Sequence, residues 1–262
     1  MAEAPLAVRF LVDVAAIADA EVRKLVRDPT EMFSRAVQPV LWLLVFGQVF
    51  TRTRAIPTGA LSYTEFMTPG ILAQSVLFSA IFYGISVIWE RDLGIVHKML
   101  VSPAPRSALV AGKALAAGVR GLTQAIIITM LALALGVRLR FDVASVAGTL
   151  FAVLLGSAVF ATLSLVIACI VKTRERFMGI GQVLTMPLFF ASNAIYPLTL
   201  MPQWLHGVAR ANPLTYLVDM LRALMLQGSA STMGVGVDLL VLVVTFVILV
   251  TIAARLYPTI VR

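Results

Sequence analysis

Charged residues are scarce in this sequence, and their scarcity excludes a water-soluble globular domain. Only 13% of the 262 residues are Asp, Glu, Lys or Arg, whereas 60% are hydrophobic and the mean hydropathy is +0.96. A soluble domain of this size carries roughly a quarter of charged residues. Since the remaining polar residues are too few to cover a water-facing surface, the composition predicts an integral membrane protein.

Cysteine and histidine are also nearly absent, which excludes several kinds of site. The one cysteine is Cys169, inside an apolar run, so neither an intrachain disulfide nor a cysteine-based metal site is possible. The two histidines, His97 and His206, fall on opposite predicted sides of the membrane and cannot share a metal. We therefore expect no metal site on this chain.

The sequence lacks the motifs of an energy source or a catalytic centre. There is no GxxxxGK[ST] phosphate-binding loop, no HExxH and no GxSxG. The mid-span acids and bases of a proton-driven transporter are missing too, with Arg120 as the only candidate. Either the third span begins near Arg120 and the guanidinium reaches the interface, or this arginine contacts an intramembrane partner or a substrate. We expect no catalytic residue and no cofactor on this chain.

Apolar runs of spanning length predict an α-helical bundle. A helix needs roughly 20 apolar residues to cross the hydrocarbon core, and no strand alternation is sustained enough for a barrel. The first run is short, and the fourth is long enough to tilt. The six predicted spans are about 36–51, 67–89, 113–136, 143–171, 177–198 and 236–256, in one transmembrane domain over residues 1–262.

The segment before the first span has a different pattern. Residues 6–27 alternate apolar and charged positions as in an amphipathic helix that lies in the membrane interface. Asp28-Pro29 ends this helix, because the residue before proline is pushed out of the α region. Residues 1–30 are therefore predicted to form an interfacial helix, either a simple surface anchor or one that also contacts a cytoplasmic partner.

The distribution of basic residues predicts the orientation. With six spans, 14 Lys and Arg residues fall on the side of the termini and 6 on the opposite side. Cytoplasmic loops carry the excess of Lys and Arg, so both termini and the loop 90–113 are predicted to be cytoplasmic, and the loop 199–235 external. The net charge of +8 therefore indicates cytoplasmic loops and not a nucleic-acid partner.

A compact charged stretch, ERDLGIVHKML, separates the second and third predicted spans. Its two acids favour the positive end of a short helix, and Pro103 and Pro105 end that helix. Such a helix can seat in a groove of a soluble protein, or the stretch can be a solvated loop. The residues predicted to contact a partner are Glu90, Arg91, Asp92, Gly94, Ile95, Lys98, Met99 and Leu100.

Prolines and aromatic residues gather near the end of the fifth predicted span. Irregular backbone at membrane depth survives only where it is buried in protein or lines a cavity. The aromatic residues can instead form an interfacial belt. Asp219 and Arg222 are three residues apart and can pair on one helix face, exposed to solvent or not.

Three segments together resemble the ABC type 2 permease family. They are ERDLGIVHKMLVSPAPRSALVAGKAL, FFASNAIYPLTLMPQWLHGVAR and ANPLTYLVDMLRALMLQG. Their order and spacing match the family's charged, proline-rich and NP-x-T-Y segments over nearly the whole chain, in its bacterial daunorubicin-resistance and nodulation-export branch. One departure is Ile95, where threonine is common.

The resemblance implies a multi-pass protein of the bacterial plasma membrane that works as a homo- or heterodimer. Each subunit docks on a separate cytoplasmic ABC ATPase, which binds ATP and magnesium, and the dimer interface uses the first and fifth spans. Glu90 to Leu100 form the coupling helix, and the N-terminal helix also touches the ATPase. Membrane lipids are further partners, and nucleic acid is not.

The resemblance also implies short re-entrant helices before the last span and an external gate region from Asn193 to Leu226. The expected gate residues are Phe189, Phe190, Asn193, Tyr196, Pro197, Pro202, Trp204, Asn212, Pro213, Tyr216, Asp219 and Arg222.

The predicted function is a non-enzymatic permease subunit of an ATP-driven exporter for an amphipathic drug-like or lipid-like compound. One alternative is export of a polysaccharide or a lipid-linked glycan. This alternative is less favoured because aromatic residues are only 8% of the chain. Another alternative is a membrane anchor for an ATPase in an assembly that does not transport.

Overall fold

The fold is known from a computed structural model that describes residues 36–54, 56–94, 106–171 and 173–257, with five isolated residues between 12 and 23. Within these ranges every regular element is a helix. The one β feature there is an isolated bridge between Leu139 and Leu226. The prediction of an all-α fold is therefore confirmed for the described part of the chain.

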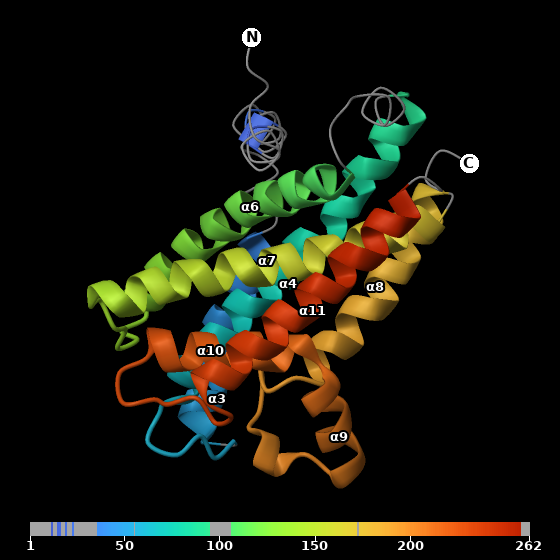
Figure 1. Ribbon diagram of the computed structural model, residues 1–262. Coiled ribbons are helices and arrows are strands. Elements are labelled where there is room, and N and C mark those ends of the chain that lie inside the picture. Colours follow the sequence, from blue (N-terminus) through green and yellow to red (C-terminus); the bar gives the residue numbers. More distant parts are fainter. Residues whose placement is uncertain are drawn as a thin grey trace.

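Among the described residues, four helices are long and apolar enough to cross a membrane. They are α4 (Tyr63–Asp92), α6 (Arg106–Ala134, apolar from Ala111), α7 (Val143–Ile170) and α11 (Val235–Leu256). α7 lies at the centre and packs against α4, α6, α11 and the shorter α10 (Pro213–Met225) (Figure 1). The second, third, fourth and sixth predicted spans correspond to these four helices.

The other two predicted spans are shorter than expected, so the count of six is not confirmed. Residues 36–41 are α-helical, but the winding then changes to the π-helix η1 (Trp42–Gly47) before α3 (Gln48–Thr53). The fifth predicted span is α8 (Arg174–Phe190), of 17 residues, which ends three residues after Pro187. Pro187 lies inside its last turn, where the ring removes one backbone donor of the helix.

Capping residues define where the long helices begin. The Ser62 hydroxyl accepts a hydrogen bond from the Glu65 amide, and the Glu65 carboxylate accepts one from the Ser62 amide, which forms a capping box for α4. Asp142 caps α7 by accepting from the Ser145 amide at 3.0 Å. Hydrogen bonds from the side chain and the amide of Ser145 hold the pKa of Asp142 below its ordinary value. Both caps satisfy amides that have no partner inside the helix.

Small residues allow the long helices to approach closely. A Cβ on Gly84 of α4 would collide with the Ser164 hydroxyl and the Phe177 ring, and one on Gly121 of α6 would collide with Ser157. The Ser164 hydroxyl of α7 donates to the Ile81 carbonyl of α4 and accepts from the Gly84 amide. Small residues and hydroxyl groups at helix contacts are typical of packing inside membranes.

The bundle has two ends, which are named here by their residues. At the Asp92 end lie the last residues of α4, α7 and α11 and the first residues of α8 (Figure 1). At the α10 end lie α3, η2 (Leu198–Leu200), α9 (Gln203–Ala211) and α10. The predicted interfacial helix of residues 1–30 falls almost wholly outside the described residues. Of its five described residues, Asp19 and Arg23 form an exposed ion pair at 2.8 Å.

Candidate functional site

The charged stretch at the Asp92 end does not begin with a new helix. Glu90, Arg91 and Asp92 are the last residues of α4, and Gly94 follows with a φ of +72°. The Leu93 amide still donates to the Trp89 carbonyl. The prediction that Glu90 and Asp92 open a short helix is therefore wrong, because the hydrogen-bond ladder of α4 runs through them and places them at its negative end.

Glu90 faces the interior of the bundle. Its carboxylate lies 2.5 Å from the ammonium of Lys113 on α6, and their side chains are 6% and 0% exposed. The Lys113 nitrogen also lies 5.8 Å from the centre of the Tyr83 ring. We predicted that Glu90 contacts a partner protein, whereas in this geometry its charge connects α4 to α6.

Asp92 and Arg91, by contrast, are accessible from outside the bundle. Asp92 accepts hydrogen bonds at 2.8 Å from Arg91 and from Arg174 at the start of α8. The Arg174 guanidinium lies 3.4 Å from the centre of the exposed Trp89 ring. This cluster presents charge and an aromatic face at the Asp92 end. The other predicted contact residues, Ile95, Lys98, Met99 and Leu100, lie outside the described residues.

Arg120 lies in the middle of α6. Its side chain is 9% exposed, and its guanidinium lies 4.6 Å from the centre of the Tyr83 ring of α4. Within the described ranges no carboxylate forms an ion pair with it, and its Nε and Nη1 have no hydrogen-bond partner. α6 begins 14 residues before Arg120, so this arginine is not in the first turn of its helix; the depth at which it lies in the membrane stays a prediction.

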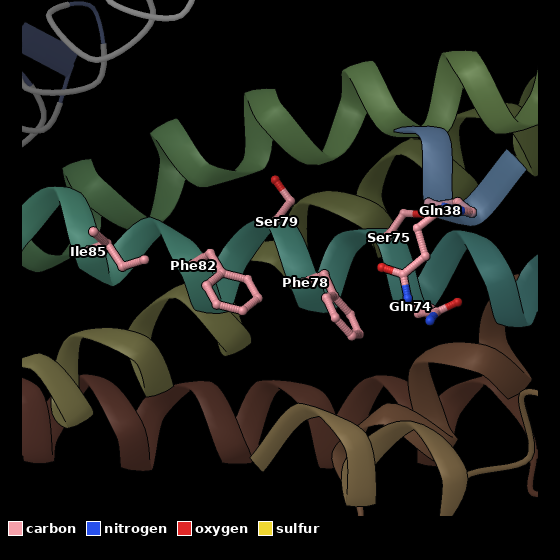
Figure 2. A pocket seen from close by; sticks show the side chains of 8 residues that line it. Gln38, Gln74, Ser75, Phe78, Ser79, Phe82 and Ile85 are labelled. Carbon is pink, nitrogen blue, oxygen red and sulfur yellow. The ribbon is translucent and has the colours of Figure 1, made fainter. Parts of the chain in front are cut away.

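A groove of about 270 Å³ runs along α4 beside the helical residues 36–41. Gln74 is buried in its lining, and its Oε1 has no hydrogen-bond partner among the residues that the structure describes. Figure 2 shows Phe78 and Phe82 projecting from one face of α4, with their ring centres 6.1 Å apart. The groove combines apolar rings with amide and hydroxyl groups; its lining is Gln38, Pro39, Gln74, Ser75, Phe78, Ser79, Phe82 and Ile85.

At the α10 end, Asn212 and Pro213 connect two helices. The Asn212 side chain accepts from the Leu214 amide at 2.9 Å and caps α10, with Pro213 as the first helical residue. Its Nδ2 donates to the Leu188 carbonyl of α8 at 2.7 Å. Since the last carbonyls of a helix need outside partners, this asparagine satisfies the end of α8 and the beginning of α10 together.

The aromatic residues of the predicted gate do not form one cluster. Tyr196 and Tyr216 donate their hydroxyls to the carbonyls of Phe190 and Arg210, at the ends of α8 and α9. Phe189 is buried and meets Trp42 with ring centres 6.0 Å apart. Trp204 on α9 is 72% exposed. Pro197 and Pro202 precede η2 and α9 as their N-cap residues.

Asp219 and Arg222 are both buried in α10, where each binds a different group. Asp219 accepts from the Ser231 and Thr232 hydroxyls and the Met233 amide, each at 3.0 Å. Arg222 donates to the Asn193 carbonyl at 2.8 Å. The spacing of three residues allows an ion pair, but the structure uses Asp219 to hold the segment before α11 and Arg222 to hold the segment after α8.

Two features were not identified from the sequence. The Glu90–Lys113 pair has a weak sequence signal, since both charges adjoin span ends on the same predicted side. The groove has a signal in the recurrence of Gln74, Ser75, Phe78, Ser79 and Phe82 along one face of α4. Whether that face of α4 is accessible depends on the segments that pack beside it, and the periodicity of the sequence does not identify those segments.

The sequence was compared with known families and proteins. The profile of the ABC-2 type transporter family matches residues 13–226. The transport permease ycf38 of Cyanophora paradoxa is 30% identical over 203 residues, which cover 77% of this chain and 70% of the relative. The daunorubicin resistance ABC transporter permease protein DrrB1 of Streptomyces coeruleorubidus is 24% identical over 229 residues, 87% of this chain and 80% of the relative. The inner membrane transport permease YadH of Escherichia coli K12 is 25% identical over 223 residues, 83% and 80% of the two chains.

Proposed function

Since the chain belongs to the ABC-2 type transporter family, we propose that it is the membrane permease subunit of an ATP-driven exporter. Its cargo is an amphipathic drug-like or lipid-like compound, and a separate cytoplasmic ATPase supplies the energy. The observation that carries the cargo class is the groove on α4, where two phenylalanine rings lie beside buried amide and hydroxyl groups. Such a lining suits a molecule with an apolar body and a few polar groups.

The orientation belongs to the proposal as well. The Asp92 end faces the cytoplasm, because the segments on that side carry the excess of Lys and Arg. The ATPase then meets the Asp92–Arg174–Trp89 cluster together with the segment from Ile95 to Leu100. Glu90 is a structural residue in this scheme, since its carboxylate is buried against Lys113. The α10 end, with α9 and α10 as the proposed re-entrant helices, faces outward.

A second permease chain completes the transporter in this proposal. Large apolar side chains are exposed on residues 36–49 and on α8, among them Val37, Leu41, Val45, Met178 and Val183. These are the first and fifth predicted spans, which the family resemblance places at the dimer interface. Cysteine pairs introduced at Leu41 and Val183 are expected to cross-link two chains. Cross-links that form only between positions on α6 and α7 would contradict this interface.

Reconstituted transport tests the cargo class. The permease and its co-purified ATPase are placed in vesicles, and ATP-dependent movement of daunorubicin, a fluorescent amphipathic probe, is measured. The double variant Phe78→Ala/Phe82→Ala is expected to lose transport while ATP hydrolysis and membrane abundance are retained. Phe141→Ala, which removes an exposed ring outside the groove, serves as the matched control. Transport of a lipid-linked glycan in place of the probe would favour the alternative cargo.

Co-purification tests the ATPase contact. Ile95→Asp/Met99→Asp is expected to lose the ATPase and export at normal membrane abundance, because a charge would then be buried in the docking groove. Phe141→Asp/Val143→Asp places the same charges at exposed positions of the opposite end and is expected to be neutral. Normal complex formation and export in the first variant would show that the stretch is a solvated loop.

Cysteine labelling tests the orientation independently. Thr58→Cys at the α10 end is expected to react with an impermeant thiol reagent in intact cells, and Ser102→Cys is not. The native Cys169 is buried and gives little background. The reverse labelling pattern would overturn the assignment of the two ends.

A further inference from the structure

A second cavity lies at the α10 end, apart from the groove on α4. Its volume is about 350 Å³, and it is lined by residues of the segments 57–61, 193–199 and 229–232, by Phe66 of α4 and by Arg222 of α10. The polar groups that line it come from Arg222, Asn193, Thr58, Thr199, Ser229 and Thr232. This cavity is formed where three connecting segments meet the beginning of α4 and the side chain of Arg222.

The guanidinium of Arg222 is the one cationic group of the cavity lining. The residue is 6% exposed, and its Nη2 donates to the carbonyls of Asn193 at 2.8 Å and Phe66 at 3.4 Å. Its Cζ lies 3.9 Å from the centre of the Phe66 ring. The Nε of Arg222 has no hydrogen-bond partner among the described residues.

Arg222 therefore carries a buried positive charge that is only partly compensated. Asp219 is the nearest acid on α10, but its carboxylate is bound by Ser231, Thr232 and Met233. No carboxylate of the described residues lies within ion-pair distance of the Arg222 guanidinium. Carbonyl oxygens and an aromatic face supply partial negative charge, whereas desolvating a cation is costly unless a full opposite charge is near.

Asn193 adds a second unsatisfied group to the same cavity. Its side chain is 2% exposed, and neither Oδ1 nor Nδ2 has a hydrogen-bond partner in the part of the chain that the structure describes. A buried amide without partners is destabilising, and such groups are rare in folded proteins. Two side chains more than nine-tenths buried thus line one cavity with unused hydrogen-bonding capacity.

We propose that this cavity binds a phosphate group, with Arg222 and Asn193 as its ligands. The Nε–H of the Arg222 guanidinium is a charged donor that suits a phosphate oxygen, and the Nδ2 of Asn193 supplies another donor. A cation is excluded by the charge of Arg222, and a neutral ligand would leave that charge uncompensated. The phosphate belongs either to the headgroup of a phospholipid or to free phosphate, since both present the same oxygens.

The site is a property of this chain alone and does not depend on export or on an ATPase. Binding is therefore measured on the purified full-length chain. In detergent, the midpoint of thermal unfolding is followed against inorganic phosphate, with chloride at matched ionic strength. In a second arm, chains extracted from nanodiscs that contain phosphatidylglycerol and phosphatidylcholine are examined by native mass spectrometry for the lipid retained.

Two variants and a control decide the outcome. Arg222→Gln removes the charge and is expected to weaken phosphate or phosphatidylglycerol binding at least tenfold. Asn193→Asp places a carboxylate beside Arg222, so it is expected to abolish binding and to raise the unfolding midpoint without ligand. Arg210→Gln removes an exposed arginine of α9 at the same end and is expected to leave binding unchanged.

The arms distinguish the source of the phosphate. A midpoint that rises with inorganic phosphate in the wild type and in Arg210→Gln, but in neither site variant, identifies free phosphate. Retention of phosphatidylglycerol with the same pattern identifies a lipid headgroup. The proposal is overturned if the wild type responds in neither arm, or if Asn193→Asp binds as the wild type does. Because Asn193→Asp conserves size, it tests the site even where Arg222→Gln fails to fold.

Discussion

Each end of the bundle buries one basic residue, and the two residues differ in how their positive charge is compensated. At the Asp92 end, Lys113 is fully buried and meets the Glu90 carboxylate at 2.5 Å. At the α10 end, Arg222 is 6% exposed and is held by two backbone carbonyls and the Phe66 ring. The first site is a closed ion pair, and the second retains donors without partners.

The difference follows from what each residue connects. Lys113 and Glu90 lie on two long helices, α6 and α4, whose contact positions both side chains. Arg222 lies on the short helix α10 and reaches the Asn193 carbonyl of the segment after α8 and the Phe66 carbonyl of α4. The charges of a buried pair neutralise each other, whereas no carboxylate of the described residues lies within ion-pair distance of Arg222.

The largest expected effect comes from breaking the closed pair. Lys113→Met removes the ammonium that lies 2.5 Å from the buried Glu90 carboxylate, and breaking such a buried pair costs about 3–5 kcal/mol. The free energy of unfolding in mixed micelles measures this loss. The double variant Lys113→Met/Glu90→Met is expected to recover most of it, because both charges are then absent. A double variant as unstable as the single one would show that the pair is not the source of the stability.

A smaller loss of stability is expected from a substitution that forces α4 away from the backbone of Ala194 at the α10 end. Gly70 of α4 faces the backbone of Ala194, and a Cβ there would collide with the Ala194 carbonyl. Overpacking of this kind costs about 1–3 kcal/mol, so Gly70→Ala is expected to lower the unfolding midpoint and to disturb the segment that carries Asn193. Gly179→Ala on α8, where a Cβ meets nothing within 4 Å, is the control. Equal midpoints for the two variants would contradict this packing.

Removing the cation at the α10 end is expected to cost less than breaking the closed pair. Arg222→Met leaves the Asn193 carbonyl without its donor, a loss of about 1–3 kcal/mol for an unsatisfied buried group. Loss of an uncompensated buried charge offsets part of that cost. The same unfolding assay compares Arg222→Met with Lys113→Met. A loss as large as that of Lys113→Met would show that Arg222 is as fully neutralised as Lys113.

The smallest effect on stability is expected at the surface of the Asp92 end. Arg174→Gln removes the ion pair between Arg174 and Asp92, whose side chains are 32% and 37% exposed. Partly exposed pairs contribute about 0–1 kcal/mol and are screened by salt, so the unfolding midpoint is expected to change little and only at low salt. A loss comparable to that of Lys113→Met would mean that this cluster is part of the core.

Much of the helical framework follows from local sequence. The apolar runs predict α4, α7 and α11 closely, and Ser62 and Asp142 mark the starts of α4 and α7 because their side chains satisfy free amides. The short π-wound segment at Trp42–Gly47 and the early end of α8 near Pro187 were not predicted. Hydropathy reports how apolar a run is, whereas the winding of its backbone depends on partners such as Thr64, whose hydroxyl donates to the Gly47 carbonyl at 3.0 Å.

The sequence by itself determined a membrane-embedded, helical chain, because too few charges remain to cover a water-facing surface. It also determined the family, through segments such as ANPLTYLVDMLRALMLQG whose order and spacing are local properties. Only the tertiary structure decided which charges are neutralised. Glu90 and Lys113 are 23 residues apart and lie on two different helices, and Asn193 and Arg222 are 29 apart. The solvation of a charge depends on which atoms surround it in space, and neighbours in the sequence do not specify those atoms.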